Sequence, residues 1–234
     1  MRTLIMIPAY NEEANIQKVV DNIIKEYPYY DYIIINDGST DRTEEICKRE
    51  KYNVLNLPIN LGIGGAVQAG YRYAKKYHYD IAIQIDGDGQ HDIAYAEKMI
   101  RIIENGEADI VIGSRFLENK GFQSSGTRRL GIRFLSRLIK VCTQVSIKDV
   151  TSGFRVVNKK YIDIYSGDYS NDYPEPEAIV SAVMYGGTIR EFPVEMRERQ
   201  GGESSIRLWN AIYYMIKVTL AIIIRRISYG IRRK

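Results

Sequence analysis

Short, continuously apolar segments alternate with longer amphipathic segments through the first half of this chain, and no other feature constrains its fold as strongly. A run such as residues 32–36, apolar at almost every position, predicts a strand buried on both faces. Residues 13–27 carry apolar side chains three and four positions apart, which predicts a helix. The alternation therefore predicts an α/β fold with a mainly parallel sheet and helices on both faces.

The same patterns place elements along the whole chain. We expect strands over residues 3–8, 32–36, 54–57, 81–85, 109–113 and 188–196. We expect helices over residues 13–27, 63–77, 93–105, 126–142 and 174–185, and a helix start at 41–44. We also expect a loop-to-strand segment over residues 151–157, and a hinge at 201–205 before a long final helix. Residues 1–205 then form the main domain, and residues 206–234 form an amphipathic, basic C-terminal helix.

Composition narrows the class of protein. An apolar fraction of 45% with six Pro and 19 Gly excludes disordered and collagenous chains. Two cysteines, Cys47 and Cys142, cannot form a disulfide framework, so we expect a reducing compartment. The N-terminus lacks the long apolar stretch and the cleavage site of a signal peptide, which predicts a location on the cytoplasmic side.

Charge is distributed unevenly along the chain. Residues 199–234 contain eight Lys and Arg and one Glu, a formal charge of +7, so that the other 198 residues carry −3 of the total of +4. A nucleic-acid-binding protein is expected to carry a basic footprint on its fold, so this distribution argues against nucleic acid as a partner. A membrane surface fits the basic tail better.

Four polar loops follow predicted strands, at residues 8–12, 36–41, 86–91 and 113–115. Because parallel sheets bind ligands beyond the carboxyl ends of their strands, we expect these loops to meet at one site. In the third loop, Asp86 and Asp88 offer hard oxygen ligands for Mg²⁺ or Mn²⁺. The alternative is an acidic turn that caps the next helix, for which Asp92 would suffice, and His91 fits either a ligand-facing or a helix-start position.

Seven segments, taken in order, resemble the glycosyltransferase family 2 domain of the GT-A fold. They are residues 7–12 (IPAYNE), 36–41 (NDGSTD), 60–62 (NLG) with Ala66 and Gly70, 86–91 (DGDGQH), 113–116 (GSRF), 151–155 (TSGFR) and 197–205 (RERQGGESS). Within that family the chain is most similar to the polyprenyl-phosphate sugar transferases, such as the dolichyl-phosphate mannose synthases.

The resemblance implies a UDP- or GDP-linked sugar donor and inversion at the anomeric carbon. It implies that the nucleoside is held by Pro8, Tyr10, Glu12 and Asp37, and that the metal on the diphosphate is held by Asp86, Asp88 and Gln90. It also implies that the phosphates are faced by Arg115, Arg199 and either Arg128 or Arg129. Of these residues, Asp88, Arg115 and Arg199 would lie at the reacting centre. A divalent cation and guanidiniums are groups that stabilise a departing diphosphate. Turn formation by Pro8, Tyr10 and Asp37, and solvated surface positions for the arginines, are the structural alternatives.

The candidate general bases are three carboxylates. Asp149 lies just before residues 151–155, and Glu175 and Glu177 flank Pro176 at a predicted helix start. A hydroxyl acceptor needs a base, whereas a phosphate acceptor is already ionised. Glu175 and Glu177 could equally stabilise the helix through its dipole, so both roles stay open.

Spacing excludes other nucleotide sites. Residues 62–65 (GIGG) do not extend to Gly-x-Gly-x-x-Gly because residue 67 is Val, and no Lys follows a glycine loop as it does in a P-loop. The Gln-x-x-Arg-Trp signature of processive polysaccharide synthases is missing, because Leu208 separates Arg207 from Trp209. We therefore expect transfer of one sugar per acceptor.

Polar or small residues recur every three or four positions from Arg207 to Arg232, among mostly apolar ones. The apolar run 208–224 is short for a membrane span and contains Asn210 and Lys217. An amphipathic helix in the membrane interface, with its cations facing anionic lipid, is the favoured interpretation. A contact with a membrane partner protein and a buried core helix are the alternatives. Related transferases often carry transmembrane helices after this point, whereas we expect none here, so a small hydrophobic partner protein stays an alternative to the interfacial helix. A homo-oligomer is a further alternative.

These inferences together predict a metal-dependent inverting glycosyltransferase that moves one sugar to a polyprenyl phosphate, peripheral at the cytoplasmic face of the membrane. Two alternatives are transfer to a saccharide hydroxyl in surface-polysaccharide assembly and a non-catalytic nucleotide-sugar-binding scaffold for a membrane partner.

Overall fold

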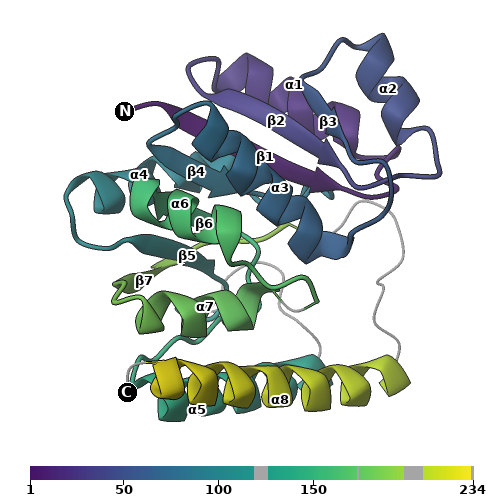
Figure 1. The fold of residues 1–234 in the computed structure, drawn as a ribbon. Coiled ribbons are helices and arrows are strands. Elements are labelled where there is room, and N and C mark those ends of the chain that lie inside the picture. The colour runs from purple at the N-terminus through teal and green to yellow at the C-terminus, as the bar shows by residue number, and fades with distance from the viewer. Residues whose placement is uncertain (119–125, 173, 198–207, 233–234) are drawn as a thin grey trace.

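The structure, a computed structural model, describes residues 1–118, 126–172, 174–197 and 208–232 (Figure 1). Among these residues, seven strands form one sheet in the order β3-β2-β1-β4-β6-β5-β7. The strands are β1 (Thr3–Ala9), β2 (Asp31–Asn36), β3 (Val54–Asn56), β4 (Ile81–Gln84), β5 (Ile110–Ser114), β6 (Arg155–Asn158) and β7 (Ile189–Pro193). β6 is antiparallel to β4 and β5, and the other neighbouring pairs are parallel. The predicted mainly parallel sheet is confirmed, with one strand reversed.

Helices cover both faces of the sheet, as the apolar runs predicted. They are α1 (Ile16–Glu26), α2 (Thr43–Arg49), α3 (Gly62–Lys76), α4 (Ala96–Glu104), α5 (Gly126–Thr143), α6 (Lys159–Gly167), α7 (Pro174–Met184) and α8 (Leu208–Arg232), with a short 3-10 turn, η1, at Ile93–Tyr95. We did not predict α6. It begins where the Asn158 side chain accepts a hydrogen bond from the backbone N–H of Tyr161, 3.2 Å away, which is a typical helix cap.

Strand β1 shows why the chain needs two helical layers. All seven of its residues are buried. Leu4 and Met6 face a core shared with α3 and α6, whereas Ile5 and Ile7 face a second core shared with α1 and α4. Burial of each such side chain contributes about 1.5–3 kcal/mol, so both faces stabilise the sheet.

The order of the strands fixes where a ligand can bind. The chain moves outward from β1 through β2 to β3, and then returns to place β4 on the other side of β1. In parallel sheets the crevice at such a reversal, beyond the carboxyl ends of the strands, is the usual binding site. The loops that follow β1 and β4 therefore border the candidate site.

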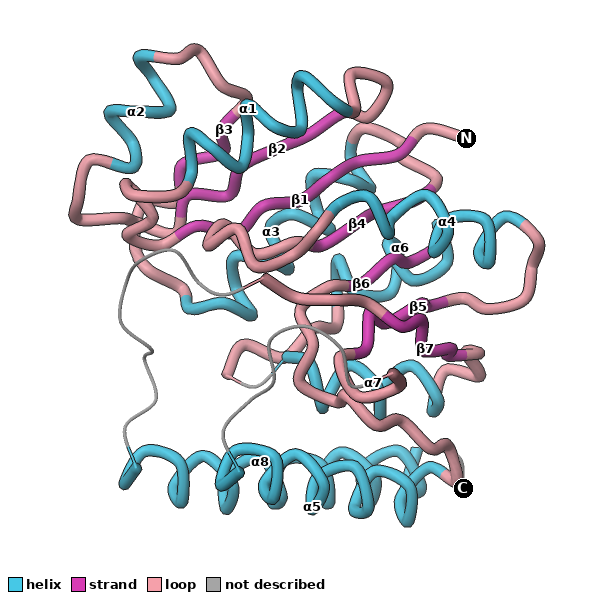
Figure 2. The backbone as a smooth tube through the Cα atoms, turned by 180° about the vertical axis from the view of Figure 1, so that it is seen from behind, coloured by secondary structure: helices cyan, strands magenta, loops and turns pink. Residues whose placement is uncertain are grey.

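Helices α5 and α8 form an outer layer, separated from the sheet by α7 (Figures 1 and 2). They lie side by side and parallel. A Cβ atom on Gly131 would lie 3.3 Å from Met215 Sδ, and Arg226 Nε donates to the Cys142 carbonyl at 2.9 Å. Within the described ranges, we find no helix with the length and apolar character that crossing a membrane requires.

Candidate active site

The loops after β1 and β4 are in direct contact at the crevice. A Cβ atom on Gly87 would lie 3.2 Å from the Pro8 carbonyl oxygen and 3.5 Å from Glu12 Cγ, so only glycine fits there without displacement. The Glu12 carboxylate accepts a hydrogen bond from the Asn15 side chain at 2.9 Å, which fixes the start of α1. Residues proposed for the nucleoside and for the metal thus border one space.

Asp37 at the end of β2 is buried, and its Oδ1 accepts a hydrogen bond from the backbone N–H of Leu61 at 2.7 Å. Burial raises the pKa of this carboxyl, and backbone hydrogen bonds oppose the rise. Gly38 has a φ of +64°, and a Cβ atom added at this position would lie 2.8 Å from the Asn60 backbone nitrogen, so the turn requires glycine. Asp37 therefore organises this turn, whereas Tyr10 is 47% exposed and presents an aromatic ring to solvent.

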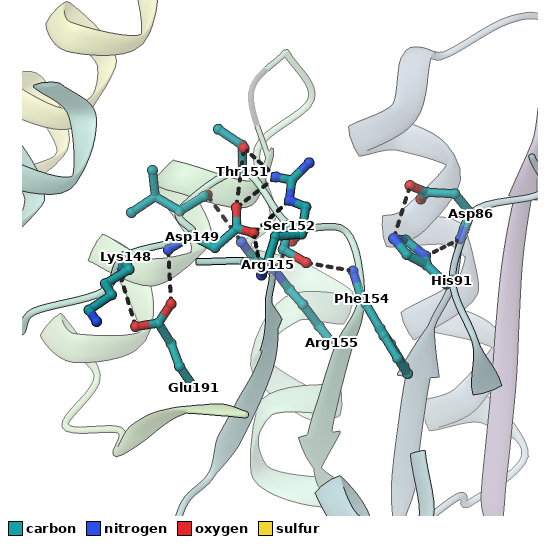
Figure 3. A network of polar contacts seen from close by, with 11 residues as sticks. Asp86, His91, Arg115, Lys148, Asp149, Thr151, Ser152, Phe154, Arg155 and Glu191 are labelled. Atoms are coloured by element: carbon teal, nitrogen blue, oxygen red, sulfur yellow. Dashed lines mark hydrogen bonds and ion pairs between the residues drawn. The ribbon is translucent and has the colours of Figure 1, made fainter. Parts of the chain in front are cut away.

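His91 supports the acidic loop from below (Figure 3). Its Nδ1 accepts a hydrogen bond from the backbone N–H of Asp86 at 3.0 Å, and its ring stacks on Phe154 with centroids 5.3 Å apart. Burial lowers the pKa of His91 to about 4, so the ring is neutral with its proton on Nε2. Nε2 lies 3.7 Å from Asp86 Oδ2. His91 is thus an internal support for Asp86.

Gly153 in the segment 151–155 lies directly against the carboxylate of Asp86. A Cβ atom at position 153 would lie 2.8 Å from Oδ1 and 3.1 Å from Oδ2. The carboxylate therefore sits in a cradle that any larger residue would fill.

Replacing Gly153 by Ala is expected to raise the divalent-cation concentration needed for half-maximal activity by roughly tenfold or more, because the methyl group displaces Asp86. A cation titration of the transfer rate measures this. Gly167→Ala is the matched control, because a Cβ at position 167 meets no atom within 4 Å. An unchanged titration for Gly153→Ala would show that Asp86 does not hold the cation.

Asp88 and Gln90 lie on the same turn. Asp88 is buried, and its Oδ1 accepts a hydrogen bond from the Gln90 backbone N–H at 3.0 Å. Gln90 in turn is bonded to Arg197, whose backbone N–H donates to the Gln90 carbonyl at 3.0 Å and whose carbonyl accepts from the Gln90 amide at 3.3 Å. Asp92 accepts from Ala94 N, as the capping interpretation predicted for that residue.

The donor set fits a cation that keeps other ligands. Within the described part of the chain, no three His, Cys, Asp or Glu side chains are grouped to hold a metal ion. Asp86 and Asp88 would supply two carboxylates, and water and diphosphate oxygens would complete the shell, as is usual for Mg²⁺ bound with a phosphate substrate.

Arg115 and Asp149 form a buried ion pair beside this centre (Figure 3). Arg115 donates from Nε to Asp149 Oδ2 and from Nη2 to Oδ1, both at 2.7 Å, and also to Thr151 Oγ1 at 3.1 Å. The Glu191 carboxylate accepts from the backbone N–H groups of Lys148 and Asp149, both at 2.8 Å. Asp149 thus positions Arg115, and its carboxylate lies fully buried behind the guanidinium.

Arg155 ties two segments of the site together. Its fully buried guanidinium donates to the Ser152 carbonyl and to the Glu175 carbonyl, each at 2.9 Å. Burial raises the pKa of the Glu175 carboxyl, Arg155 opposes the rise and the negative charge of Asp86 adds to it. Glu175 therefore lies within electrostatic reach of the candidate metal ligand.

Glu177 belongs to a different environment. It accepts a hydrogen bond from Ser170 Oγ at 2.8 Å and lies 4.0 Å from Arg225 of α8. Burial raises the pKa of its carboxyl. Glu177 thus contacts Ser170 and α8, whereas the Glu175 carbonyl accepts from Arg155.

A basic cavity of about 410 Å³ opens along α5. Its lining residues are Phe116, Arg129, Ile132, Arg133, Ser136, Arg137 and Lys148. Arg129 also lies over the Phe116 ring, 5.5 Å from its centroid. The Arg128 side chain and Arg199 lie outside the described residues.

Several of these residues were not among our predicted site residues. Arg133 and Arg137 follow Arg129 at intervals of four, so the helical repeat could have grouped them. Arg155 ends the segment 151–155 that carries the family resemblance, although no role was predicted for it, whereas no local pattern identifies Lys148.

Comparison with known proteins identifies the family. The model of glycosyl transferase family 2 matches residues 4–165. The polyprenol monophosphomannose synthase of Mycolicibacterium smegmatis is 26% identical, over 93% of this chain and 85% of its own. The UDP-N-acetylglucosamine–dolichyl-phosphate N-acetylglucosaminyltransferase of Methanococcus voltae is 30% identical, over 82% of this chain and 84% of its own.

A solved structure supports the fold. The glucosyl-3-phosphoglycerate synthase of Mycobacterium tuberculosis, in complex with Mn²⁺, UDP and glucosyl-3-phosphoglycerate, superposes with a TM-score of 0.71 at 20% identity, covering 96% of this chain and 79% of that one. With the family model matching more than half of the chain, this protein belongs to glycosyl transferase family 2 and is a glycosyltransferase of the GT-A fold.

Proposed function

We propose that this protein transfers one sugar from a UDP- or GDP-linked donor to a polyprenyl phosphate, with inversion at the anomeric carbon and with bound Mg²⁺ or Mn²⁺. The observation that carries the acceptor assignment is the basic cavity along α5, which suits a phosphate. The names of the relatives from M. smegmatis and M. voltae, which include polyprenol and dolichyl phosphate, support the same acceptor class.

On the donor side, the side chains at the β1–β4 crevice would bind and orient the nucleotide. The exposed Tyr10 ring is available to stack on the base, and Pro8, Glu12 and Asp37 would shape the nucleoside site. Asp86 and Asp88, with Gln90, would hold the cation, which when bound supplies positive charge to the departing diphosphate. Arg115, held by Asp149, would face the same phosphates, and Arg128 or Arg129 and Arg199 are further candidates for this role.

On the acceptor side, a phosphate oxygen would attack the anomeric carbon while the bond from that carbon to the diphosphate oxygen breaks. The nucleoside diphosphate leaves, and the sugar remains bound to the acceptor phosphate. No proton has to be removed, because the acceptor is already ionised. The guanidiniums of Arg129, Arg133 and Arg137 would orient it.

Replacing Arg133 or Arg137 by Ala is expected to raise the KM for a short-chain polyprenyl phosphate roughly tenfold, since each loses a charge-assisted hydrogen bond. The KM for the nucleotide sugar should not change. Lys140→Ala is the control, because Lys140 is an exposed cation of the same helix and does not line the cavity. Equal KM values for all these variants and the parent would contradict the acceptor site.

The pH dependence distinguishes the phosphate acceptor from a hydroxyl acceptor. If Glu175 acted as the base, activity would be lost as the pH falls through its raised pKa, and Glu175→Gln would abolish it. With a phosphate acceptor we expect the acidic limb near the second phosphate pKa, about 6, in both proteins. A pH profile of kcat/KM for both proteins measures this, and an inactive but folded Glu175→Gln would favour the hydroxyl acceptor.

The thermal stability of Glu175→Gln shows whether a loss of activity in this variant has a structural cause. A raised pKa means that the folded protein holds the Glu175 proton more tightly than the unfolded chain, so this group's contribution to stability is lost as the pH rises through the raised value. At pH 7 the neutral Gln should therefore leave Tm unchanged or raise it. A strongly lowered Tm would indicate a structural role.

We place the protein at the cytoplasmic face of the membrane as a peripheral protein, because a polyprenyl phosphate is a membrane lipid. The two alternatives lack a specific observation. A saccharide acceptor would not require the cationic cavity, and the relatives named above are transferases rather than binding proteins.

The activity can be tested directly. Incubation with a panel of radiolabelled UDP- and GDP-sugars and a polyprenyl phosphate is expected to give an organic-extractable product that requires Mg²⁺ or Mn²⁺. Only water-soluble product would contradict the lipid acceptor, and full activity in EDTA would contradict the cation.

A further inference from the structure

The final helix, α8, lies along the side of α7 that faces away from the sheet, and it is tied to the loop between α6 and α7, residues 168–172 (Figure 1). Arg225 forms an ion pair with Asp168 at 2.6 Å, and Lys217 forms one with Asp172 at 2.7 Å. The expectation that the cations of this helix face lipid is wrong for Lys217 and Arg225, because acidic residues distant in sequence pair with them. The two ion pairs hold both ends of one loop against α8.

Of the two cations, Arg225 holds the loop more firmly. Its side chain is 23% exposed, against 42% for Lys217, and solvent weakens exposed ion pairs. Arg225 also donates to the buried Ser181 Oγ on α7 at 3.0 Å, and it lies 4.0 Å from Glu177 Oε2. The other oxygen of that carboxylate accepts from Ser170 Oγ at 2.8 Å. Arg225 therefore holds the loop both directly and through this carboxylate.

The opposite side of the loop packs on the first turn of α3. Gly64 of that turn lies so close to the loop that an added Cβ atom would overlap the Ser170 carbonyl oxygen and would lie 2.6 Å from the Asn171 carbonyl carbon. Tyr169 is buried, with its ring centroid 5.4 Å from that of Tyr71 on α3. The loop is therefore in direct contact with α8 on one side and with α3 on the other.

The first turn of α3 borders the candidate nucleoside site. The backbone N–H of Leu61, just before the helix, donates to Asp37 Oδ1 at 2.7 Å. The neighbouring Asn60 nitrogen lies against Gly38, the residue that follows Asp37. A displacement of residues 61–64 would therefore move or release Asp37, which we assign to the nucleoside.

We propose that Arg225 is a positioning residue for the nucleotide donor: through loop 168–172 it holds the first turn of α3, and with it Asp37, in the geometry that binds the nucleoside. The contacts run from the guanidinium to the loop and from the loop backbone to Gly64. This inference rests on the proposed function for the class of ligand, a nucleoside diphosphate sugar. It gives the C-terminal helix a role inside the catalytic domain.

Calorimetric titration of the full chain with UDP and with GDP, in the presence of Mn²⁺, tests this role. Arg225→Met keeps the length of the side chain and removes the guanidinium. We expect it to raise the Kd of the nucleotide that the parent binds, and the KM for the nucleotide sugar, roughly tenfold. The KM for the polyprenyl phosphate should stay that of the parent, which a general loss of folded protein would not explain.

The matched control is Arg226→Met. Arg226 is the next residue of α8, but it donates to the Cys142 carbonyl on α5 and should leave the nucleotide Kd unchanged. Gly64→Ala tests the other end of the contact. Alanine is the better helix former, so without the loop this substitution would stabilise α3. Against the loop, we expect the methyl group to raise the nucleotide Kd roughly tenfold or more.

A double variant shows whether both substitutions act through the same loop. Once Gly64→Ala has separated the turn from the loop, adding Arg225→Met should raise the nucleotide Kd little further, whereas fully additive losses would contradict a shared support. If thermal melts show that Arg225→Met does not fold, Ser170→Ala takes its place, because it removes only the bond to Glu177 and should raise the Kd roughly threefold.

An unchanged nucleotide Kd in the folded Arg225→Met variant, or a rise in the polyprenyl-phosphate KM alone, would overturn the proposal. The same holds for a parent-like Kd in Ser170→Ala where that variant is used. If the parent binds nucleotide in an Arg225-dependent way but transfers no sugar to a polyprenyl phosphate, the proposed function fails while the positioning role stands. If the parent transfers sugar and Arg225→Met binds nucleotide equally well, only the positioning role fails.

Discussion

Replacing Asp88 by Asn is expected to lower kcat/KM for sugar transfer by roughly a thousandfold or more, because one of the two carboxylates available to the cation is neutralised. The substitution preserves the shape of the side chain, and Oδ1 of an Asn can still accept the hydrogen bond from the Gln90 backbone N–H. The loop conformation should therefore survive while cation binding is lost. Calorimetric titration with Mn²⁺ and the nucleotide sugar should show this loss directly.

The control for this prediction is a carboxylate from the same loop. Asp92 caps η1 through Ala94 N and pairs with Arg197, so it reaches the candidate cation site only indirectly, through the hydrogen bonds between the Arg197 backbone and Gln90. Asp92→Asn should keep activity within a fewfold of the parent. If Asp88→Asn were as active as Asp92→Asn, the assignment of Asp88 to the cation would be wrong.

The second large effect concerns the buried pair of Arg115 and Asp149. Arg115→Met would leave a fully buried Asp149 carboxylate without its guanidinium, which costs about 3–5 kcal/mol. For a domain of this size the loss corresponds to a fall in Tm of roughly 10 °C. Activity should fall as well, because the same guanidinium is our candidate for contact with the donor phosphates.

A double variant separates the two contributions. Arg115→Met combined with Asp149→Leu removes both charges, so we expect it to recover much of the stability but none of the activity. Arg101→Met is the control, since Arg101 pairs with Glu97 on an exposed helix face and should change stability by less than about 1 kcal/mol. Additive stability losses in the double variant would show that the two side chains do not act as a pair.

The sequence predicted the framework well because the framework depends on local pattern. The apolar runs located β1, β2, β4 and β5, and the loops after β1 and β4 are in contact at the crevice. The direction of β6 was not predictable in this way, because it depends on the path of the chain between β5 and β6. Helix α6 begins at an Asn cap that a closer inspection of residues 158–161 could have found.

The site was predicted less completely, because long-range contacts assign the roles. Glu175 and Glu177 are equivalent in sequence, yet the Glu175 carbonyl accepts from Arg155, whereas the Glu177 carboxylate accepts from Ser170. Asp149 carries no local sign of its pairing with Arg115, 34 positions away. The helical repeat of the C-terminal segment predicted an amphipathic helix, but not the ion pairs of its Lys217 and Arg225 with Asp172 and Asp168, which are distant in sequence.

The most direct test of the central claim compares two acceptors that differ only in the phosphate. With the nucleotide sugar that gives the highest rate, and with Mg²⁺ or Mn²⁺ present, a polyprenyl phosphate should yield a labelled glycolipid that extracts into organic solvent. The polyprenol of the same chain length should yield none. Equal transfer to the alcohol, or transfer to neither lipid with any donor, would contradict the assignment of this chain as a polyprenyl-phosphate sugar transferase.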